Sequence, residues 1–273
     1  MTRCVPAPAL VLGSVVGIQA GQACGKLLFG LVPPVGVVAL RLGFAALVLC
    51  ALWRPRRWPE RRDLPLILGL GTAIAGMHAI YPALERLPVG AAVTIQFLGP
   101  LTVALAGSRR LRDVAWAGLA GLGVFLFYGP GTTALPTAGV AFALVSGACW
   151  AAYVLLVKRI GARASDPSLL ALAVAWAALL CVPFGVAGAD LARPGVLLAG
   201  FGVAVLSAVL PWSLDLAALR RMPARVFGVL ASLEPALGGL AGVVILGEHL
   251  APAQWLAIGS VVAASIGVTL PRP

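Results

Sequence analysis

Apolar residues occur in ten long runs along the chain, and short segments rich in arginine, proline and glycine separate them. The runs cover approximately residues 9–29, 34–53, 64–84, 89–107, 114–129, 138–157, 167–187, 195–218, 226–247 and 251–270. An α-helix needs about 20 apolar residues to cross the roughly 30 Å hydrocarbon core of a bilayer. The pattern therefore predicts an all-α integral membrane protein with ten transmembrane helices. Because the linkers are short, we expect one compact membrane domain.

Two segments of the chain resemble each other at an offset of 135 residues. Residues 83–88 (ALERLP) align with residues 218–223 (ALRRMP), and the dipeptide at 99–100 (GP) aligns with that at 234–235 (EP). An offset of 135 residues contains five runs, which is an odd number, so the two halves, 1–133 and 134–273, would enter the membrane in opposite directions. This predicts a 5+5 inverted-topology repeat, an architecture used by carriers that work by alternating access.

Composition supports a membrane protein. Apolar residues make up 61% of the chain and charged residues only 11%, with a mean hydropathy of +1.02. These values exclude the soluble fold classes. The net charge of +11 raises the question of a nucleic-acid partner, but the basic residues lie in short clusters between apolar runs instead of forming one basic domain. Lipid is therefore expected as the surrounding partner, and nucleic acid is not.

The positions of the basic residues predict the orientation in the membrane. If the N-terminus is cytoplasmic, 16 of the 20 lysines and arginines fall on the cytoplasmic side and only Arg86 and Arg193 fall outside. Lys26 and Arg41 lie within runs. Cytoplasmic loops of membrane proteins are enriched in lysine and arginine. We therefore expect both termini in the cytoplasm.

The ninth run carries one charge, Glu234, with Pro235 directly behind it. At 1.5 Å per residue the carboxylate lies about 12 Å from Val226, deep in the hydrocarbon core. A carboxylate at that depth costs about 2.5 to 3.5 kcal/mol, so it is expected to face a polar cavity. Pro235 cannot donate to the carbonyl of Ala231, which leaves a backbone acceptor at the same depth. This predicts a water-accessible point for binding or proton exchange between helices.

Other polar and aromatic side chains within the runs are candidates for the same site. The candidate substrate-binding residues are Gln19, Gln22, Lys26, Arg41, His78, Tyr81, Gln96, Trp150, Tyr153 and Trp212. Asp215 is the other acid within a run, and it forms with Glu234 the candidate proton-coupling pair.

Several of these residues have an equally plain structural explanation. Lys26 can extend its amine to the outer surface, and Arg41 can pair with a group of the protein itself. His78 can cap a helix, and aromatic residues near the middle of a span can simply pack. The sequence leaves both explanations open.

Motifs for catalysis and cofactor binding are absent from the sequence. It has no GxxxxGK[ST] loop, no HExxH, no GxSxG and no carboxylate pair at metal-ligand spacing. Four of the five cysteines lie inside apolar runs, and none forms a CxxC pair. We therefore expect no catalytic residue, no cofactor and no metal, and the protein is not expected to be an enzyme. A gradient of protons or of substrate would then supply the energy.

Four stretches carry a resemblance to a known family: ALRLGFAALVL (39–49), QFLGPLTVALAGSRR (96–110), GACWAAYVL (147–155) and LPWSLDLAALRRMPARVFGVLASLEPALGGLAGVVILGE (210–248). With these the chain resembles the drug/metabolite transporter superfamily, and in it the EamA-type ten-span members, most of all bacterial threonine and homoserine exporters. The resemblance implies a multi-pass protein of the bacterial inner membrane that exports small amino acids by proton antiport.

The resemblance also assigns roles to single residues. Glu234 matches the acid of the family's E-P motif, Arg41 matches the basic residue of the second span, and Trp150 matches an aromatic residue of the sixth span. The first half departs from the motif because it has Gly99 at the position of the acid, so two symmetric carboxylates are not expected.

The leading hypothesis is a secondary carrier for small, neutral, hydroxyl-bearing amino acids. Its expected contacts are a cation for the substrate carboxylate (Arg41 or Lys26), an acid for the ammonium group (Asp215 or Glu234) and amides for the hydroxyl group (Gln19, Gln22, Gln96). A broad drug and metabolite exporter is the nearest alternative. An intramembrane enzyme acting on lipid and a purely structural membrane subunit are more distant alternatives, and the choice between monomer and homodimer stays open.

Overall fold

In the computed structural model, residues 6–54, 60–61, 63–106, 111–126, 135–160, 167–187 and 191–269 are described. The candidate site residues all lie within these ranges. Some of the arginines that orient the chain lie outside them: Arg3, Arg56, Arg57, Arg62, Arg109, Arg110, Arg163 and Arg272.

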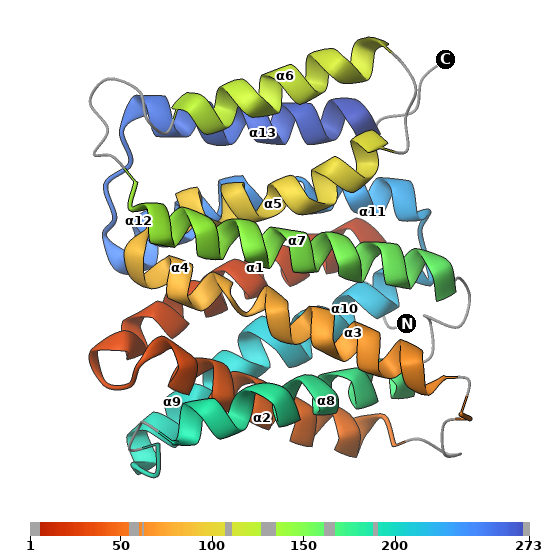
Figure 1. Ribbon diagram of the computed structural model, residues 1–273, viewed down its shortest axis with the longest axis vertical. Helices are drawn as coiled ribbons and strands as arrows, with labels where there is room; N and C mark the ends of the chain where they lie inside the picture. Colours follow the sequence, from red (N-terminus) through yellow and green to blue (C-terminus); the bar gives the residue numbers. More distant parts are fainter. Residues whose placement is uncertain are drawn as a thin grey trace.

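Every regular element in the described part of the chain is a helix, and the helices run side by side along one direction (Figure 1). The elements are α1 (Ala7–Leu27), η1 (Leu28–Gly30), α2 (Pro34–Leu52), α3 (Leu64–Met77), α4 (Ile80–Arg86), α5 (Val89–Ala106), α6 (Leu111–Leu126), α7 (Thr137–Ile160), α8 (Pro167–Val186), α9 (Pro194–Ala204), η3 (Val205–Val209), α10 (Leu210–Leu219), α11 (Ala224–Ala231), α12 (Glu234–Leu246) and α13 (Pro252–Thr269). The predicted all-α fold class is confirmed.

Within the described residues, eight helical segments are long and apolar enough to cross a membrane, and α6 and α13 contain shorter apolar helices. Each of the ten predicted runs corresponds to one of these ten segments. The outer surface of the bundle carries many large apolar side chains, such as Leu47, Phe125, Phe184 and Val244. Such a surface suits contact with lipid acyl chains, and the chain is a multi-pass membrane protein.

Prolines mark where many of the helices begin. Pro34, Pro167, Pro194 and Pro252 each occupy the first position of a helix. That position needs no backbone N–H donor, and the fixed φ of proline already suits a helix. At the other end of α12, Gly247 adopts φ 66°, the left-handed conformation that often terminates a helix.

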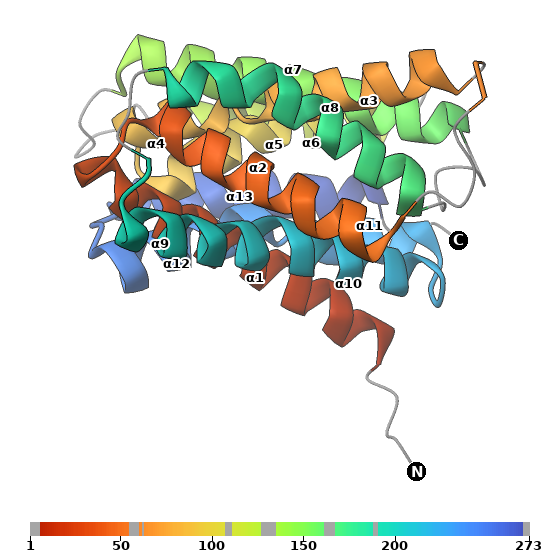
Figure 2. The same cartoon turned by 90° about the horizontal axis from the view of Figure 1, so that it is seen from below.

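Seen from below, the helices form two layers, with α3, α7 and α8 in one layer and α1 and α9 to α12 in the other (Figure 2). Helix α2 packs on α8, α5 on α7 and α12, and α6 on α13. Helix α1 contacts α4, α9, η3, α10, α11 and α12. Polar side chains of α1 therefore meet residues from both halves of the chain.

Three of the predicted spans are irregular near the middle of the bundle. The third span is divided into α3 and α4 at His78 and Ala79. The eighth span contains the π-helical turn η3. The ninth span is divided into α11 and α12 by Ser232 and Leu233. Interruptions at membrane depth are tolerated where backbone polar groups find partners in the protein or in water. We therefore expect polar side chains or water next to the interruptions in these three spans.

Candidate functional site

Glu234 lies at the break in the ninth span. It is the first residue of α12, Pro235 is the second, and α11 ends at Ala231. The interruption expected from the Glu-Pro pair is therefore present. The N-terminus of a helix carries a partial positive charge, which stabilises a carboxylate without a neighbouring cation. This geometry explains how an acid that is only 7% exposed is held inside the bundle.

Gln19 of α1 is the direct neighbour of Glu234. Its Nε2 donates to Glu234 Oε2 across 3.5 Å, at the long limit of a hydrogen bond. Gln22 and Lys26 follow on the same face of α1, three and seven residues further along the helix. A polar stripe therefore runs from Glu234 toward the C-terminal end of α1.

Asp215 of α10 joins the group around Glu234. It is partly buried and close enough to interact electrostatically with both Glu234 and Tyr153 of α7. Ser14 of α1 lies beside it. The structure thus brings together the two acids that the sequence singled out as a proton-coupling pair.

Four buried polar atoms of this region have no hydrogen-bond partner among the described residues: Gln19 Oε1, Gln22 Oε1, Tyr81 Oη and Asp215 Oδ1. A buried unpaired polar atom costs about 1 to 3 kcal/mol, and native structures keep few of them. All four belong to residues predicted for the site. Gln19 and Gln22 lie on one face of α1, so their two unpaired oxygens indicate a place where water or a ligand can complete the hydrogen bonding.

Arg41 of α2 is held by neutral groups. Its Nε donates to Ser207 Oγ (2.7 Å), one terminal nitrogen donates to the Ser207 carbonyl (2.6 Å), and the other meets His78 Nε2 (2.5 Å). The guanidinium also lies 5.8 Å from the centre of the Tyr81 ring. No carboxylate among the described residues pairs with it. Of its five N–H donors these contacts use three, so two remain for a further acceptor.

His78 follows α3 and occupies its C-cap position. Its Nδ1 lies 2.7 Å from the Ile74 carbonyl, which can only accept, and its Nε2 faces Arg41, which can only donate. This arrangement fits a neutral imidazole with its proton on Nδ1. The ring also stacks on Tyr81, with 6.2 Å between ring centres. His78 therefore holds the Arg41 guanidinium by a hydrogen bond and the Tyr81 ring by stacking.

Lys26 pairs with a residue that sequence reasoning missed. Its Nζ donates to Glu248 Oε1 and to the Leu87 carbonyl, each at 2.7 Å. Glu248 Oε2 in turn accepts from the backbone N–H of Val89, at 2.8 Å. Glu248 follows directly on the ninth apolar run, so its position at a membrane boundary, opposite a lysine near the end of another run, was the available signal.

Three further candidates, Gln96, Trp150 and Trp212, have contacts of their own. Gln96 Nε2 donates to Ser146 Oγ (2.7 Å), and Ser146 donates to the Met77 carbonyl (2.5 Å), which links α5, α7 and α3. Trp150 packs edge-on against Phe97, with 5.6 Å between ring centres. Trp212 packs against the main apolar core. In this structure these three residues contact neighbouring helices, and their role in substrate binding stays a prediction.

The fourth span has no break of the kind seen in the ninth span. Helix α5 runs without interruption from Val89 to Ala106, with Pro100 inside it. Gly99, at the position that corresponds to Glu234, packs so tightly on Gly147 of α7 that a Cβ would collide with the Gly147 carbonyl. The first half therefore has no room for a side chain where the second half has an acid, and only the ninth span is broken at its proline.

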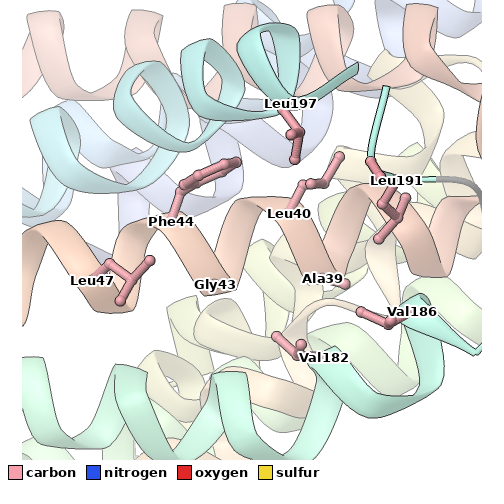
Figure 3. A pocket seen from close by; sticks show the side chains of 10 residues that line it. Ala39, Leu40, Gly43, Phe44, Leu47, Val182, Val186, Leu191 and Leu197 are labelled. Atoms are coloured by element: carbon pink, nitrogen blue, oxygen red, sulfur yellow. The ribbon is translucent and has the colours of Figure 1, made fainter. Parts of the chain in front are cut away.

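Grooves on the molecule do not coincide with the whole polar group. A groove of about 500 Å³ lies between α2, α8 and α9 and is lined by apolar side chains such as Phe44, Leu47 and Leu197 (Figure 3). A smaller groove of about 200 Å³ lies between α1 and α12 and includes Gln19. Convergent polar groups are the mark of a specific site, so we place the candidate site at the polar group and not at the larger groove.

Comparisons with known proteins show which family the chain resembles. Residues 137–270 match the model of the EamA-like transporter family. The chain is 42% identical to the threonine/homoserine exporter RhtA of Escherichia coli K12, over 96% of this chain and 90% of the relative, and 42% identical to RhtA of Salmonella typhimurium, over 98% and 94%. It is also 32% identical to the uncharacterized protein PA1977 of Pseudomonas aeruginosa, over 80% and 78%.

A solved crystal structure has the same fold, with a TM-score of 0.64 and 20% identity over 96% of both chains. The family match and the curated relatives identify a transporter and not an enzyme. The chain belongs to the EamA-like transporter family.

Proposed function

We propose that this protein exports small neutral amino acids, threonine and homoserine first among them, from the cytoplasm across the bacterial inner membrane. The observation that carries the proposal is the 42% identity to the threonine/homoserine exporter RhtA over nearly the full length of both chains. The substrates and the direction of transport are taken from the name of that relative.

The charges inside the bundle suit a zwitterion. Arg41 retains two N–H donors for the substrate carboxylate, and Glu234 and Asp215 supply acceptors for its ammonium group. Gln19 and Gln22 present unpaired amide oxygens that can accept from a substrate hydroxyl. Lys26, which the sequence also offered for the carboxylate, is engaged with Glu248. Arg41 is therefore the cation that we assign to the substrate.

Proton antiport would use the two acids. Glu234 is buried and Asp215 is partly buried, and the two acids lie close enough to interact electrostatically within the predicted membrane spans. An intramembrane carboxylate pair of this kind is typical of proton relays in transporters. In the proposed cycle, protonation of the pair accompanies release of the substrate outside, and loss of the proton to the cytoplasm prepares the site for the next substrate.

Alternating access would rest on the 5+5 inverted repeat, with 1–133 and 134–273 as the two halves. Support comes from the packing of helices that lie five spans apart, since α2 packs on α8, α5 on α12 and α6 on α13. Mates related by a two-fold pseudo-axis are expected to meet in this way. Rocking of the two halves would then expose the site to one side at a time.

Counterflow in proteoliposomes tests the substrate assignment. Vesicles preloaded with unlabelled amino acid should accumulate the same labelled amino acid when the purified protein is present. We expect accumulation for threonine and homoserine, and little for leucine or for cationic dyes. Absence of counterflow for every amino acid in the panel would overturn the proposal, and counterflow of dyes would favour the broad drug and metabolite exporter.

Replacement of Glu234 by glutamine tests the proton coupling. The substitution keeps a polar side chain of similar size but removes the titratable group, so the protein should fold and yet lose transport driven by a pH gradient, down to the level of protein-free vesicles. Glu85→Gln is the control, because Glu85 forms an exposed ion pair with Arg86 away from the site. Full pH-driven transport in the Glu234 variant would contradict the coupling role.

A further inference from the structure

We propose that Lys26 and Glu248 form the gate that closes the outer end of the transport path, an inference that rests on the alternating-access mechanism proposed above. The ion pair joins the two halves of the chain directly. Lys26 comes from α1 in the first half, and Glu248 comes from the connection between α12 and α13 in the second half. Rocking of the halves must separate such a pair.

The pair lies where three connections meet at one end of the bundle. Lys26 is next to the last residue of α1, the Leu87 carbonyl lies between α4 and α5, and Glu248 lies just beyond α12. In Figure 1 this is the end opposite to the one where α1 begins and α13 ends. If the termini are cytoplasmic, the pair lies on the outer side, where an exported substrate leaves.

Glu248 also holds the N-terminus of α5. Its second oxygen accepts from Val89, the first residue of that helix, whose N–H has no partner within the helix. The side chain lies against Gly242, where a Cβ would collide with it. One carboxylate thus fastens α1, α5 and α12 together, and its release would free all three at once.

The polar stripe on α1 leads from the candidate site to the pair. Gln19, Gln22 and Lys26 lie on one face and span about 10 Å along the helix axis. Glu234 lies at the inner end of this stripe and Glu248 at the outer end. A substrate that leaves the Gln19 region along α1 would meet the closed ion pair.

The exposure of the pair suits a contact that opens and closes. The side chains of Lys26 and Glu248 are 22% and 14% exposed. Partly hydrated ion pairs contribute little net stability, because water competes for both charges. A pair of this kind can therefore break in one state and form again in the other without unfolding its neighbours.

Accessibility of a single cysteine tests the gate independently of transport. We would place Ala23→Cys, on a chain whose native cysteines are replaced by alanine, because Ala23 is fully buried one turn inside Lys26. A membrane-impermeant maleimide added from outside should label this cysteine slowly. In Glu248→Gln and in Lys26→Gln, labelling should be about tenfold faster, because the outward-open state gains population.

Glu85→Gln provides the matched control, since it breaks an ion pair at the same end of the bundle that does not join the two halves. Its labelling rate should stay at the parent level. Unchanged labelling in both pair variants overturns the gate, and so does equal acceleration in all three variants. If one pair variant fails to fold, as judged by size-exclusion chromatography, the other decides.

Failure of the two proposals can be told apart. The labelling experiment reports only on the outer end of the bundle and needs no substrate. In one outcome, the parent protein shows no amino-acid counterflow while labelling is faster only in the Lys26 and Glu248 variants. The substrate assignment is then wrong, and the proposal that the ion pair is a gate is supported. If counterflow is present and labelling is unchanged, the pair is a static link and the gate fails.

Discussion

Arg41 and Glu234 are buried in the same bundle, and neither is neutralised by the other. Arg41 is met by Ser207, His78 and the Tyr81 ring, whereas Glu234 is met by the start of α12 and the Gln19 amide. Charges of opposite sign normally pair inside a membrane protein. Holding them apart with neutral groups leaves both able to bind a ligand that carries one charge of each sign.

The unpaired oxygen of Gln22 leads to a prediction that separates binding from stability. Gln22→Met keeps the side-chain volume and removes a buried acceptor that has no partner. The free energy of unfolding should stay equal or rise, because an unsatisfied acceptor costs about 1 to 3 kcal/mol. The KM for the exported amino acid should rise by about tenfold, the effect of losing one hydrogen bond to substrate. Thermal unfolding in detergent and vesicle transport measure the two effects.

Gln254 supplies the control for this prediction. It is equally buried, but its Oε1 accepts from the Ala251 N–H at the start of α13. Gln254→Met should therefore lower stability by about 1 kcal/mol through loss of a helix cap and leave KM unchanged. A fall in stability for Gln22→Met of the same size as for Gln254→Met would show that Gln22 is structural.

At the scale of elements, the asymmetry between the fourth and ninth spans has a packing cause. Helices α5 and α7 approach through Gly99 and Gly147, backbone against backbone. Small residues allow such close approach in membranes. The ninth span instead breaks at Ser232 and Leu233, and Ser232 is tied to Ser265 of α13 across 2.7 Å. In the first half, the contact between Gly99 and Gly147 leaves no space for a side chain. At the corresponding position the second half has Glu234.

Gly99→Ala tests this packing. The new Cβ has no space against the Gly147 carbonyl, so α5 and α7 must separate, and stability should fall by about 1 to 3 kcal/mol as in other overpacked cores. Gly118→Ala on α6 is the control, because nothing lies within 4 Å of its Cβ position. That variant should be neutral or slightly more stable. Equal thermal unfolding of the two variants would contradict the close contact.

The sequence was sufficient for the helices, because the length and the apolar composition of each run determine them locally. A proline within a run was not sufficient for a break, since α5 continues through Pro100 whereas the ninth span is interrupted before Pro235. The sequence was not sufficient for the partners of Arg41 and Lys26, since Ser207 and Glu248 are distant in the chain and only tertiary packing brings them near. The same holds for Gln96 and Trp150, whose roles depend on which helix faces them.

At the scale of the whole molecule, the two ends of the bundle differ. Helix α1 begins and α13 ends at one end, whereas α1 ends and α13 begins at the other, where the Lys26 and Glu248 pair lies (Figure 1). From the positive-inside rule we expect the first end to lie in the cytoplasm, because the sequence assigns most of the arginines between spans to that side.

Reporter fusions test this orientation. Green fluorescent protein after residue 273 should fluoresce, since it folds in the cytoplasm, and alkaline phosphatase fused after Arg193 should be active, since it needs the oxidising periplasm. Phosphatase fused after Arg221 is the control and should be inactive. The opposite pattern at Arg193 and Arg221 would reverse the membrane orientation and would place the Lys26 and Glu248 pair inside the cell.

The π-helical turn η3 determines where Arg41 of α2 is bound. In this turn Leu210 N donates to Val205 O, five residues earlier, so the eighth span holds one residue more than a regular helix of equal rise. The Ser207 carbonyl that Arg41 binds belongs to this wider turn. Deleting one residue between 205 and 209 would let α9 and α10 merge into an ordinary helix without moving either, and Arg41 would lose its docking point. A surplus residue in one helix thus fixes the guanidinium of another.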